Sequence, residues 1–306
     1  MTKRSTFLPR ILPGATAIAA ALMVAGCGPS SDSGSTGTGK RTTIANMGSD
    51  TMVNLAAAWA EAYAEVDKAV LIEVNGGGSG VGIKGLINGT AELANASRHM
   101  EEREKSELKE KRQVEPREYV IGYDALSIFV HKDNPLDEIT MEQLGEIYRA
   151  DGKITKWSDL GVTNIPGAKG DEIIRVSRQN NSGTYEYFKE VVVGDQNEFK
   201  LGSLDMNGSK DVVELVGRTP NAIGYSGMGY ANESVKTLKV ARKAGDPAVA
   251  PSIATTHDET YPIARPMYFY TAGEPEPHVK RYIDWVLSPA GQKHVEETGY
   301  VPLAGN

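Results

Sequence analysis

The stretch RQNNSGTYE (178–186) brings a guanidinium, hydroxyl side chains and a glycine together within a few residues. Its cation, Arg178, is followed by the run Ser182, Gly183 and Thr184. Guanidinium groups form charge-assisted hydrogen bonds with oxyanions, and a glycine lets a ligand approach the backbone closely. The stretch therefore predicts a binding site for an anion.

With the two residues before it, this stretch becomes VSRQNNSGTYE (176–186), and two further segments share its layout of a β-rich run, a Gly or Ser turn and then a helical pattern. They are IANMGSDTM (44–52) and IEVNGGGSGVG (72–82), the second of which contains Ser79. Helix N-termini present unpaired N–H groups and partial positive charge, so several of them facing one cleft can hold a tetrahedral oxyanion. Taken alone, residues such as Ser49 and Asp50 are more often plain helix N-caps.

The glycine loop also fits a different class of ligand. GVGIKG (80–85) matches the G-x-G-x-x-G pattern of dinucleotide-binding turns, with Glu101 and Glu102 near the expected distance downstream. These glutamates open a charged helical pattern and do not end a strand, and a lone fingerprint is weak. A nicotinamide-dependent enzyme stays open as an alternative.

Other catalytic and metal-binding patterns are absent from the sequence. There is no G-x-x-x-x-G-K-[ST] motif, Ser79 lacks the G-x-S-x-G spacing, and the five histidines show no paired metal spacing. We therefore expect no catalytic residues, no metal and no cofactor.

Length and charge limit the classes of partner. The 306 residues are enough for one or two domains, and the net charge of −7 argues against nucleic acid, which requires clustered Lys and Arg. A small anion remains compatible, because local helix dipoles act at short range whereas the net charge is screened by salt.

The N-terminus has the pattern of a bacterial lipoprotein signal. Lys3, Arg4 and Arg10 precede an apolar run that is too short for a stable membrane span and ends in small residues before Cys27, the sole cysteine. We expect residues 1–26 to be removed and Cys27 to be acylated; an ordinary signal peptide with an incidental cysteine is the alternative. Residues 27–41, rich in Gly, Ser and Thr, are typical of a flexible tether.

The remainder alternates β-rich runs with amphipathic helical patterns, which indicates an α/β fold. Two long β-rich runs, 117–132 and 261–271, flank the middle of the chain. We expect lobe 1 from 42–124 with 263–306, lobe 2 from 125–262, and the two runs as a hinge. Helices are predicted at 51–66, 81–89, 101–112, 140–151 with a Thr140/Gln143 capping box, 182–193, 209–218 capped by Ser209, 276–288 and 289–299.

Six segments, in order, resemble the phosphate-binding proteins of Pst-type ABC phosphate importers. The resemblance spans about Thr42 to Leu303 and is carried by GSDTM, NGGGSGVGIKGLINGTAELANASR, SRQNNSGTYEYF, AIGYSGMGY, YPIARPMYFYT and TGYVPL. It implies a two-lobed, type II periplasmic-binding-protein fold with a mixed sheet in each lobe and a two-strand hinge. It also implies inorganic phosphate as ligand, an ABC permease as partner and a monomeric receptor that is anchored outside the cytoplasm by its lipid.

The resemblance assigns ligand-binding roles to individual residues. Arg178, Ser182, Gly183 and Thr184 match the anion motif of the second lobe, and Ser79 matches the serine of the glycine loop in the first lobe.

Three positions in the first lobe are compared with the enteric-type members of this family. Asp50 stands where those proteins have a phosphate-binding threonine, Thr51 where a backbone N–H is used, and Arg98 where an aspartate accepts the hydrogen of monohydrogen phosphate. We hypothesise an exchange of roles, in which Asp50 accepts that hydrogen and Arg98 supplies charge. The alternative is that Asp50 only caps its helix and Arg98 faces solvent.

The sequence as a whole predicts a phosphate receptor whose two lobes close on the anion without catalysing a reaction. Receptors for sulfate, molybdate or tungstate are alternatives within the class, and a signalling or adhesion lipoprotein that has lost transport is a further one.

Overall fold

The computed structural model describes residues 41–305. The predicted signal (1–26), Cys27 and nearly all of the predicted tether lie outside the described residues. Between residues 41 and 305, no helix has both the length and the apolar character needed to cross a membrane.

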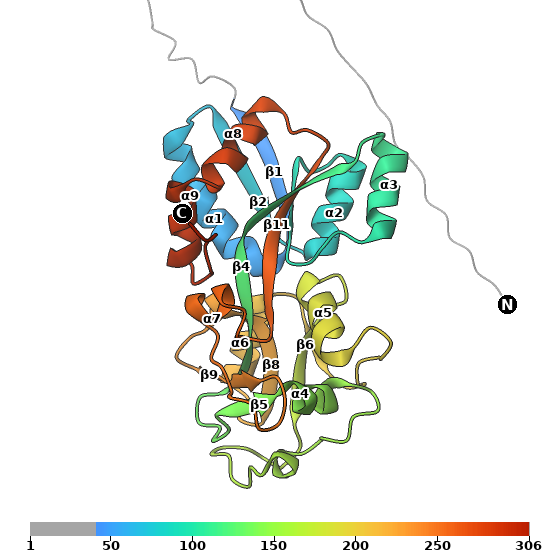
Figure 1. Ribbon diagram of the computed structural model, residues 1–306, viewed down its shortest axis with the longest axis vertical. Coiled ribbons are helices and arrows are strands. Elements are labelled where there is room, and N and C mark those ends of the chain that lie inside the picture. Colours follow the sequence, from blue (N-terminus) through green and yellow to red (C-terminus); the bar gives the residue numbers. More distant parts are fainter. Residues whose placement is uncertain (1–40, 306) are drawn as a thin grey trace, which may run out of the picture. The chain divides into compact units, whose positions relative to one another are not determined.

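One long strand, β4 (Pro116–His131), runs through both halves of the described chain (Figure 1). We call the elements before β4, together with the C-terminal segment from Ala264 onward, lobe 1. The elements between β4 and Ala264 are called lobe 2. Lobe 1 contains β1 (Thr42–Gly48), η1 (Asp50–Met52), α1 (Val53–Val66), β2 (Val70–Asn75), α2 (Ser79–Asn88), β3 (Leu93–Ala96), α3 (Glu102–Arg112), β11 (Ala264–Ala272), α8 (Pro277–Val286) and α9 (Pro289–Glu297). Lobe 2 contains β5 (Glu138–Thr140), α4 (Met141–Tyr148), η2 (Trp157–Leu160), β6 (Ile174–Arg178), α5 (Gly183–Phe188), η3 (Lys189–Val193), β7 (Leu204–Met206), α6 (Ser209–Gly217), β8 (Ala222–Gly227), η4 (Met228–Tyr230), β9 (Val235–Thr237), β10 (Lys239–Ala241) and α7 (Ile253–His257).

Within residues 41–305 the strands form a nine-stranded mixed sheet and a small two-stranded one. The order of the large sheet is β2-β1-β3-β11-β4-β8-β6-β7, with β9 also paired to β4, so β4 joins the strands of the two lobes. Strands β1, β2 and β3 are parallel, as are β6, β7 and β8, whereas β11 is antiparallel to both β3 and β4. This mixed, two-lobed α/β arrangement confirms the predicted fold class.

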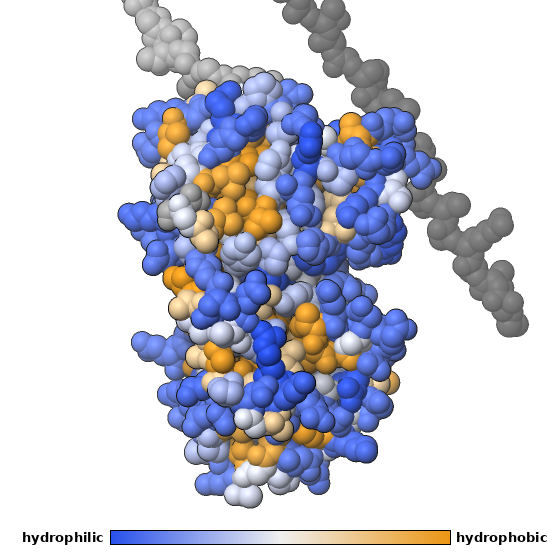
Figure 2. Space-filling view, in the orientation of Figure 1, coloured by the Kyte–Doolittle hydropathy of each residue, from blue (hydrophilic) through white to orange (hydrophobic). Residues whose placement is uncertain are grey.

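The two lobes have separate hydrophobic cores. In lobe 1, Trp59 of α1 packs edge-on against Phe269 of β11, with ring centroids 5.5 Å apart. In lobe 2, Phe188 stacks on Tyr225, with ring centroids 3.8 Å apart. Hydrophilic residues cover most of the visible face of both lobes (Figure 2), as expected for a chain with a net charge of −7.

The chain crosses between the lobes at two adjacent places. β4 is one of them, and its residue Ala125 pairs with Ala264, the first residue of β11. The other crossing is the segment that leads into β11, where the carbonyl of Ile263 accepts from the Leu126 N–H at 2.8 Å. The predicted second long strand is thus shorter than expected, because its first residues form this crossing.

Of the two helix starts with a predicted cap, one follows the local sequence signal and the other does not. The predicted capping box is present: Thr140 Oγ1 accepts from Gln143 N and Gln143 Oε1 accepts from Thr140 N. The predicted cap at Ser209 is wrong, since Gly208 is the N-cap and Ser209 begins α6. The hydroxyl of Ser209 instead accepts a hydrogen bond from Arg178.

Candidate anion-binding site

Three strand-to-helix turns, β1–η1, β2–α2 and β6–α5, meet where the two lobes contact each other. Thr51 of η1 and Thr184 of α5 are hydrogen-bonded through their hydroxyls at 2.8 Å, although they are far apart in the sequence. The loop that joins β6 to α5 (residues 179–182) also contacts the glycine loop, because Gly80 N donates to Asn181 O and Asn181 Nδ2 donates to Gly77 O. The segments that sequence analysis grouped as one anion site are therefore neighbours in space.

Arg178 lies at the centre of this contact and is completely buried. Its Nη1 donates to Ser209 Oγ (3.1 Å), and its Nη2 donates to Asn207 O (2.8 Å) and to Asp50 Oδ2 (3.1 Å). Across residues 41–305 nothing accepts a hydrogen bond from its Nε. Burial lowers the pKa of Arg178 and the Asp50 carboxylate opposes this shift; the group stays charged, because an arginine pKa lies so far above neutrality.

Asp50 is held by contacts other than helix capping. Its Oδ1 accepts from Gly77 N at 2.9 Å and its Oδ2 accepts from Arg178 of the other lobe. The Tyr230 hydroxyl donates to the Asp50 backbone carbonyl at 2.7 Å. Ser49, which precedes Asp50, makes no side-chain cap either and donates to Ser97 Oγ. The carboxylate thus faces the buried guanidinium across the lobe boundary.

A group of small polar residues surrounds the start of α5. Ser79 Oγ accepts from Ser97 N at 3.0 Å, and both serines are buried. A Cβ at Gly183 would collide with the hydroxyls of Ser79 and Ser97. Glycine at 183 therefore allows α5 of lobe 2 to reach the serines of lobe 1, while Ser182 caps the helix by accepting from Thr184 N.

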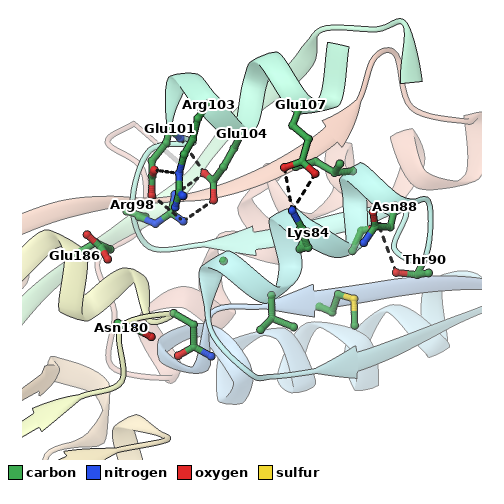
Figure 3. Close-up of a pocket in the computed structure, with 16 residues that line it drawn as sticks. Lys84, Asn88, Thr90, Arg98, Glu101, Arg103, Glu104, Glu107, Asn180 and Glu186 are labelled. Atoms are coloured by element: carbon green, nitrogen blue, oxygen red, sulfur yellow. Dashed lines mark hydrogen bonds and ion pairs between the residues drawn. The ribbon is translucent and has the colours of Figure 1, made fainter. Parts of the chain in front are cut away.

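Arg98 occupies a different place from the other predicted ligands. It lines a groove of about 720 Å³ between α2, α3 and the loop that joins β6 to α5. Arg98 Nη1 and Nη2 each donate to Glu104 at 2.8 Å, and Glu101 lies 3.6 Å from Nη2 (Figure 3). The side chain is only 10% exposed, so the alternative that Arg98 faces solvent is wrong.

Three buried polar residues of this region were missed by sequence analysis: Ser97, Asp124 and Arg265. Arg265 Nη2 and Asp124 Oδ2 form an ion pair at 2.8 Å, and Arg265 Nη2 also donates to Thr184 Oγ1 at 2.9 Å. A signal for the pair was present, since each is a charged residue inside one of the two long β-rich runs. Such residues are rarely buried without a partner.

The glycines of the dinucleotide-like pattern have a packing role here. Helix α2 begins at Ser79, so Gly80, Gly82 and Gly85 lie inside the helix and not in the turn before it. A Cβ at Gly82 would collide with the Met47 carbonyl of β1. No group of three or more His, Cys, Asp or Glu residues in the described region could hold a metal ion.

Comparisons with known proteins place these features in a family context. Residues 33–290 match the family described as PBP superfamily domain. The chain is 34% identical over 299 residues to the phosphate-binding protein PstS of Pseudomonas aeruginosa, covering 94% of this chain and 92% of that protein. A Clostridium perfringens structure with bound phosphate is similar with a TM-score of 0.75 and 30% identity, covering 86% of this chain and 100% of that one. An ABC-type phosphate transport receptor from Vibrio cholerae is similar with a TM-score of 0.66 and 25% identity, covering 85% and 100%.

Proposed function

Because the chain belongs to the PBP superfamily and, within it, to the PstS-like phosphate-binding proteins, we propose that it binds inorganic phosphate outside the cytoplasm and delivers it to an ABC transporter. Members of this family are binding receptors and not enzymes. The nicotinamide-dependent interpretation is therefore wrong, in keeping with the position of its glycines inside α2.

The observation that carries the proposal is the buried Arg178 between the lobes. A buried cation is costly unless its donors are used, and the Nε of Arg178 has no acceptor within residues 41–305. A multivalent oxyanion provides several acceptor oxygens for such a group. We propose that phosphate binds there, with further donors from Thr51, Ser79 and the run 182–184.

Binding by lobe closure follows from the position of these donors. Thr51 and Ser79 belong to lobe 1, whereas Arg178 and the run 182–184 belong to lobe 2. An anion that contacts both sets has a higher affinity for the state in which the lobes touch, and this difference drives closure. We propose that residues 42–124 with 263–306 move against residues 125–262, a division that the separate cores support.

Selectivity is proposed to depend on Asp50. Monohydrogen phosphate has a hydrogen to donate to this carboxylate, whereas sulfate has none and faces bare negative charge. We also propose a change to the other half of the predicted exchange of roles, in which Arg98 supplied the positive charge. Arg98 is engaged by Glu104 and Glu101, so we propose that Arg178 supplies the positive charge.

The experiment is calorimetry of the purified full-length chain with phosphate, sulfate and arsenate at two pH values on either side of neutrality. We expect phosphate and arsenate to bind and sulfate to bind far more weakly. Sulfate binding of equal strength at both pH values would favour the alternative of a sulfate-type receptor, because sulfate does not change protonation in this range.

The location of the protein is proposed from its N-terminus. Cys27 follows small residues at the end of an apolar run, which supports acylation and attachment of a monomeric receptor to the outer face of the cell membrane. Mass spectrometry of the mature N-terminus tests this. Loss of an acylated cysteine and release of the protein from membranes are expected for Cys27→Ala.

A further inference from the structure

Arg265 and Asp124 form a buried ion pair where the chain crosses between the lobes. They are directly opposite each other on β11 and β4, and their exposed fractions are 2% and 0%. Arg265 Nη2 and Nε lie 2.8 and 3.1 Å from Asp124 Oδ2. The pair balances its own charge, so the arginine does not need an anion for neutralisation.

The remaining donors of Arg265 contact both lobes. Nη1 donates to the carbonyls of Ser97 in lobe 1 (2.9 Å) and Gly183 in lobe 2 (3.2 Å). One hydrogen of Nη2 is used by Asp124, and the other is shared between the hydroxyl oxygens of Thr184 in lobe 2 (2.9 Å) and Thr51 in lobe 1 (3.3 Å). Separation of the lobes would remove acceptors from a buried guanidinium, so its full set of contacts exists only while the lobes touch.

The direction of these hydrogen bonds decides where one hydroxyl hydrogen points. Arginine only donates, so the oxygens of Thr51 and Thr184 both act as acceptors toward Arg265. The two hydroxyls are 2.8 Å apart, and one therefore donates to the other. The second hydroxyl hydrogen cannot point to Arg265 or to its partner threonine, and it is left for a third acceptor.

We infer that Arg265 is a positioning residue of the anion site, which directs the remaining hydroxyl hydrogen of the Thr51–Thr184 pair toward the anion when the lobes touch. The inference rests on the proposed function, because it needs an oxyanion beside Thr184. On this inference Arg265 does not contact the anion itself. Through Arg265, binding of the anion depends on contact between the two lobes.

Lobe 2 also encloses the ion pair from other sides. The guanidinium carbon of Arg265 lies 5.4 Å from the centre of the Tyr187 ring, and the Tyr187 hydroxyl donates to Ala264 O at 2.6 Å. The second carboxylate oxygen of Asp124 accepts from Met228 N at 3.2 Å. These contacts fix the plane of the guanidinium, which a lysine ammonium cannot reproduce.

The test is a double-mutant cycle on phosphate affinity in the full-length chain, with Arg265→Lys, Thr184→Val and the double variant. We expect Arg265→Lys to weaken phosphate binding about tenfold when Thr184 is present and less than about threefold in the Thr184→Val background. A purely structural role of Arg265 predicts the same loss in both backgrounds, and that result would overturn the inference.

Two controls separate the possible causes of failure. Arg117→Lys changes an exposed arginine on β4 and is expected to leave phosphate affinity unchanged. If Arg265→Lys does not fold, the pair Arg265→Gln with Asp124→Asn replaces it in the cycle, since removing both charges leaves no unpaired buried ion. Failure of the unmodified chain to bind phosphate would refute the proposed function, whereas binding without coupling refutes only the role of Arg265.

Discussion

Sequence analysis assigned both Arg178 and Arg98 to phosphate binding, yet the two side chains differ in burial and in the groups that they contact. In each of them Nε has no acceptor in the described region, but Arg178 is fully buried and its one carboxylate partner, Asp50, belongs to the opposite lobe. Arg98 lies in the groove beside α3, where two carboxylates of its own lobe, Glu104 and Glu101, surround its terminal nitrogens. We therefore expect an anion to be bound by the arginine at the lobe boundary, which has one carboxylate partner, and not by the arginine enclosed by two carboxylates of its own lobe.

The largest effect is expected at Arg178. Arg178→Gln removes a buried charge from the centre of the site, and phosphate affinity should fall by about 2–5 kcal/mol because a charge-assisted contact is lost. Calorimetry measures this directly. An affinity within threefold of the unmodified chain would show that Arg178 is not the main anion ligand.

The next effect concerns selectivity at Asp50. Asp50→Asn keeps the shape of the side chain but removes the charge that repels sulfate, so discrimination between phosphate and sulfate should fall by about 1–3 kcal/mol. Competition titration with the two anions measures the ratio. Unchanged discrimination would mean that Asp50 serves only to hold Gly77 and Arg178.

Arg98→Gln is the matched counterpart of Arg178→Gln. Because the terminal nitrogens of Arg98 are paired with Glu104 and Glu101 of its own lobe, we expect phosphate affinity to change by less than about 0.5 kcal/mol. Thermal unfolding should instead show a loss of about 1–3 kcal/mol, since the partly buried carboxylate of Glu104 loses its cation. A large loss of affinity without loss of stability would restore Arg98 as a ligand.

The smallest effect is a pH dependence at Glu186, which lines the same groove as Arg98. Burial raises the pKa of Glu186 above its ordinary value of 4.5, and Arg98 partly opposes this shift. The native state therefore binds this proton more tightly than the unfolded state, so the contribution of Glu186 to stability is present below the unfolded pKa and is lost as pH rises through the folded one.

At acidic pH, Glu186→Gln should consequently have the same stability as the unmodified chain. As the pH approaches neutrality, the variant should become the more stable of the two proteins. The difference should grow in the Arg98→Gln background, where the opposing cation is gone. Melting temperatures across this pH range measure both changes. A variant that loses stability toward neutral pH would contradict the expected sign.

Short-range patterns explain why much of the fold was predictable. The capping box at Thr140, the apolar face of α1 around Trp59, and the strand–turn–helix layout at 44–52, 72–82 and 178–186 depend on neighbours a few residues away. The two charged residues inside the long β-rich runs, Asp124 and Arg265, escaped notice because their meaning depends on a partner strand that is distant in the chain.

Residue types and spacing by themselves determined the α/β class, the two crossing segments and the three strand–turn–helix segments to which we assign the anion site. Only the tertiary structure decided which charges face each other: Asp50 with Arg178, Arg98 with Glu104, and Asp124 with Arg265. The physical reason is that helix and turn preferences act over a few residues. The availability of a buried charge instead depends on every group that folding brings within a few ångströms of it.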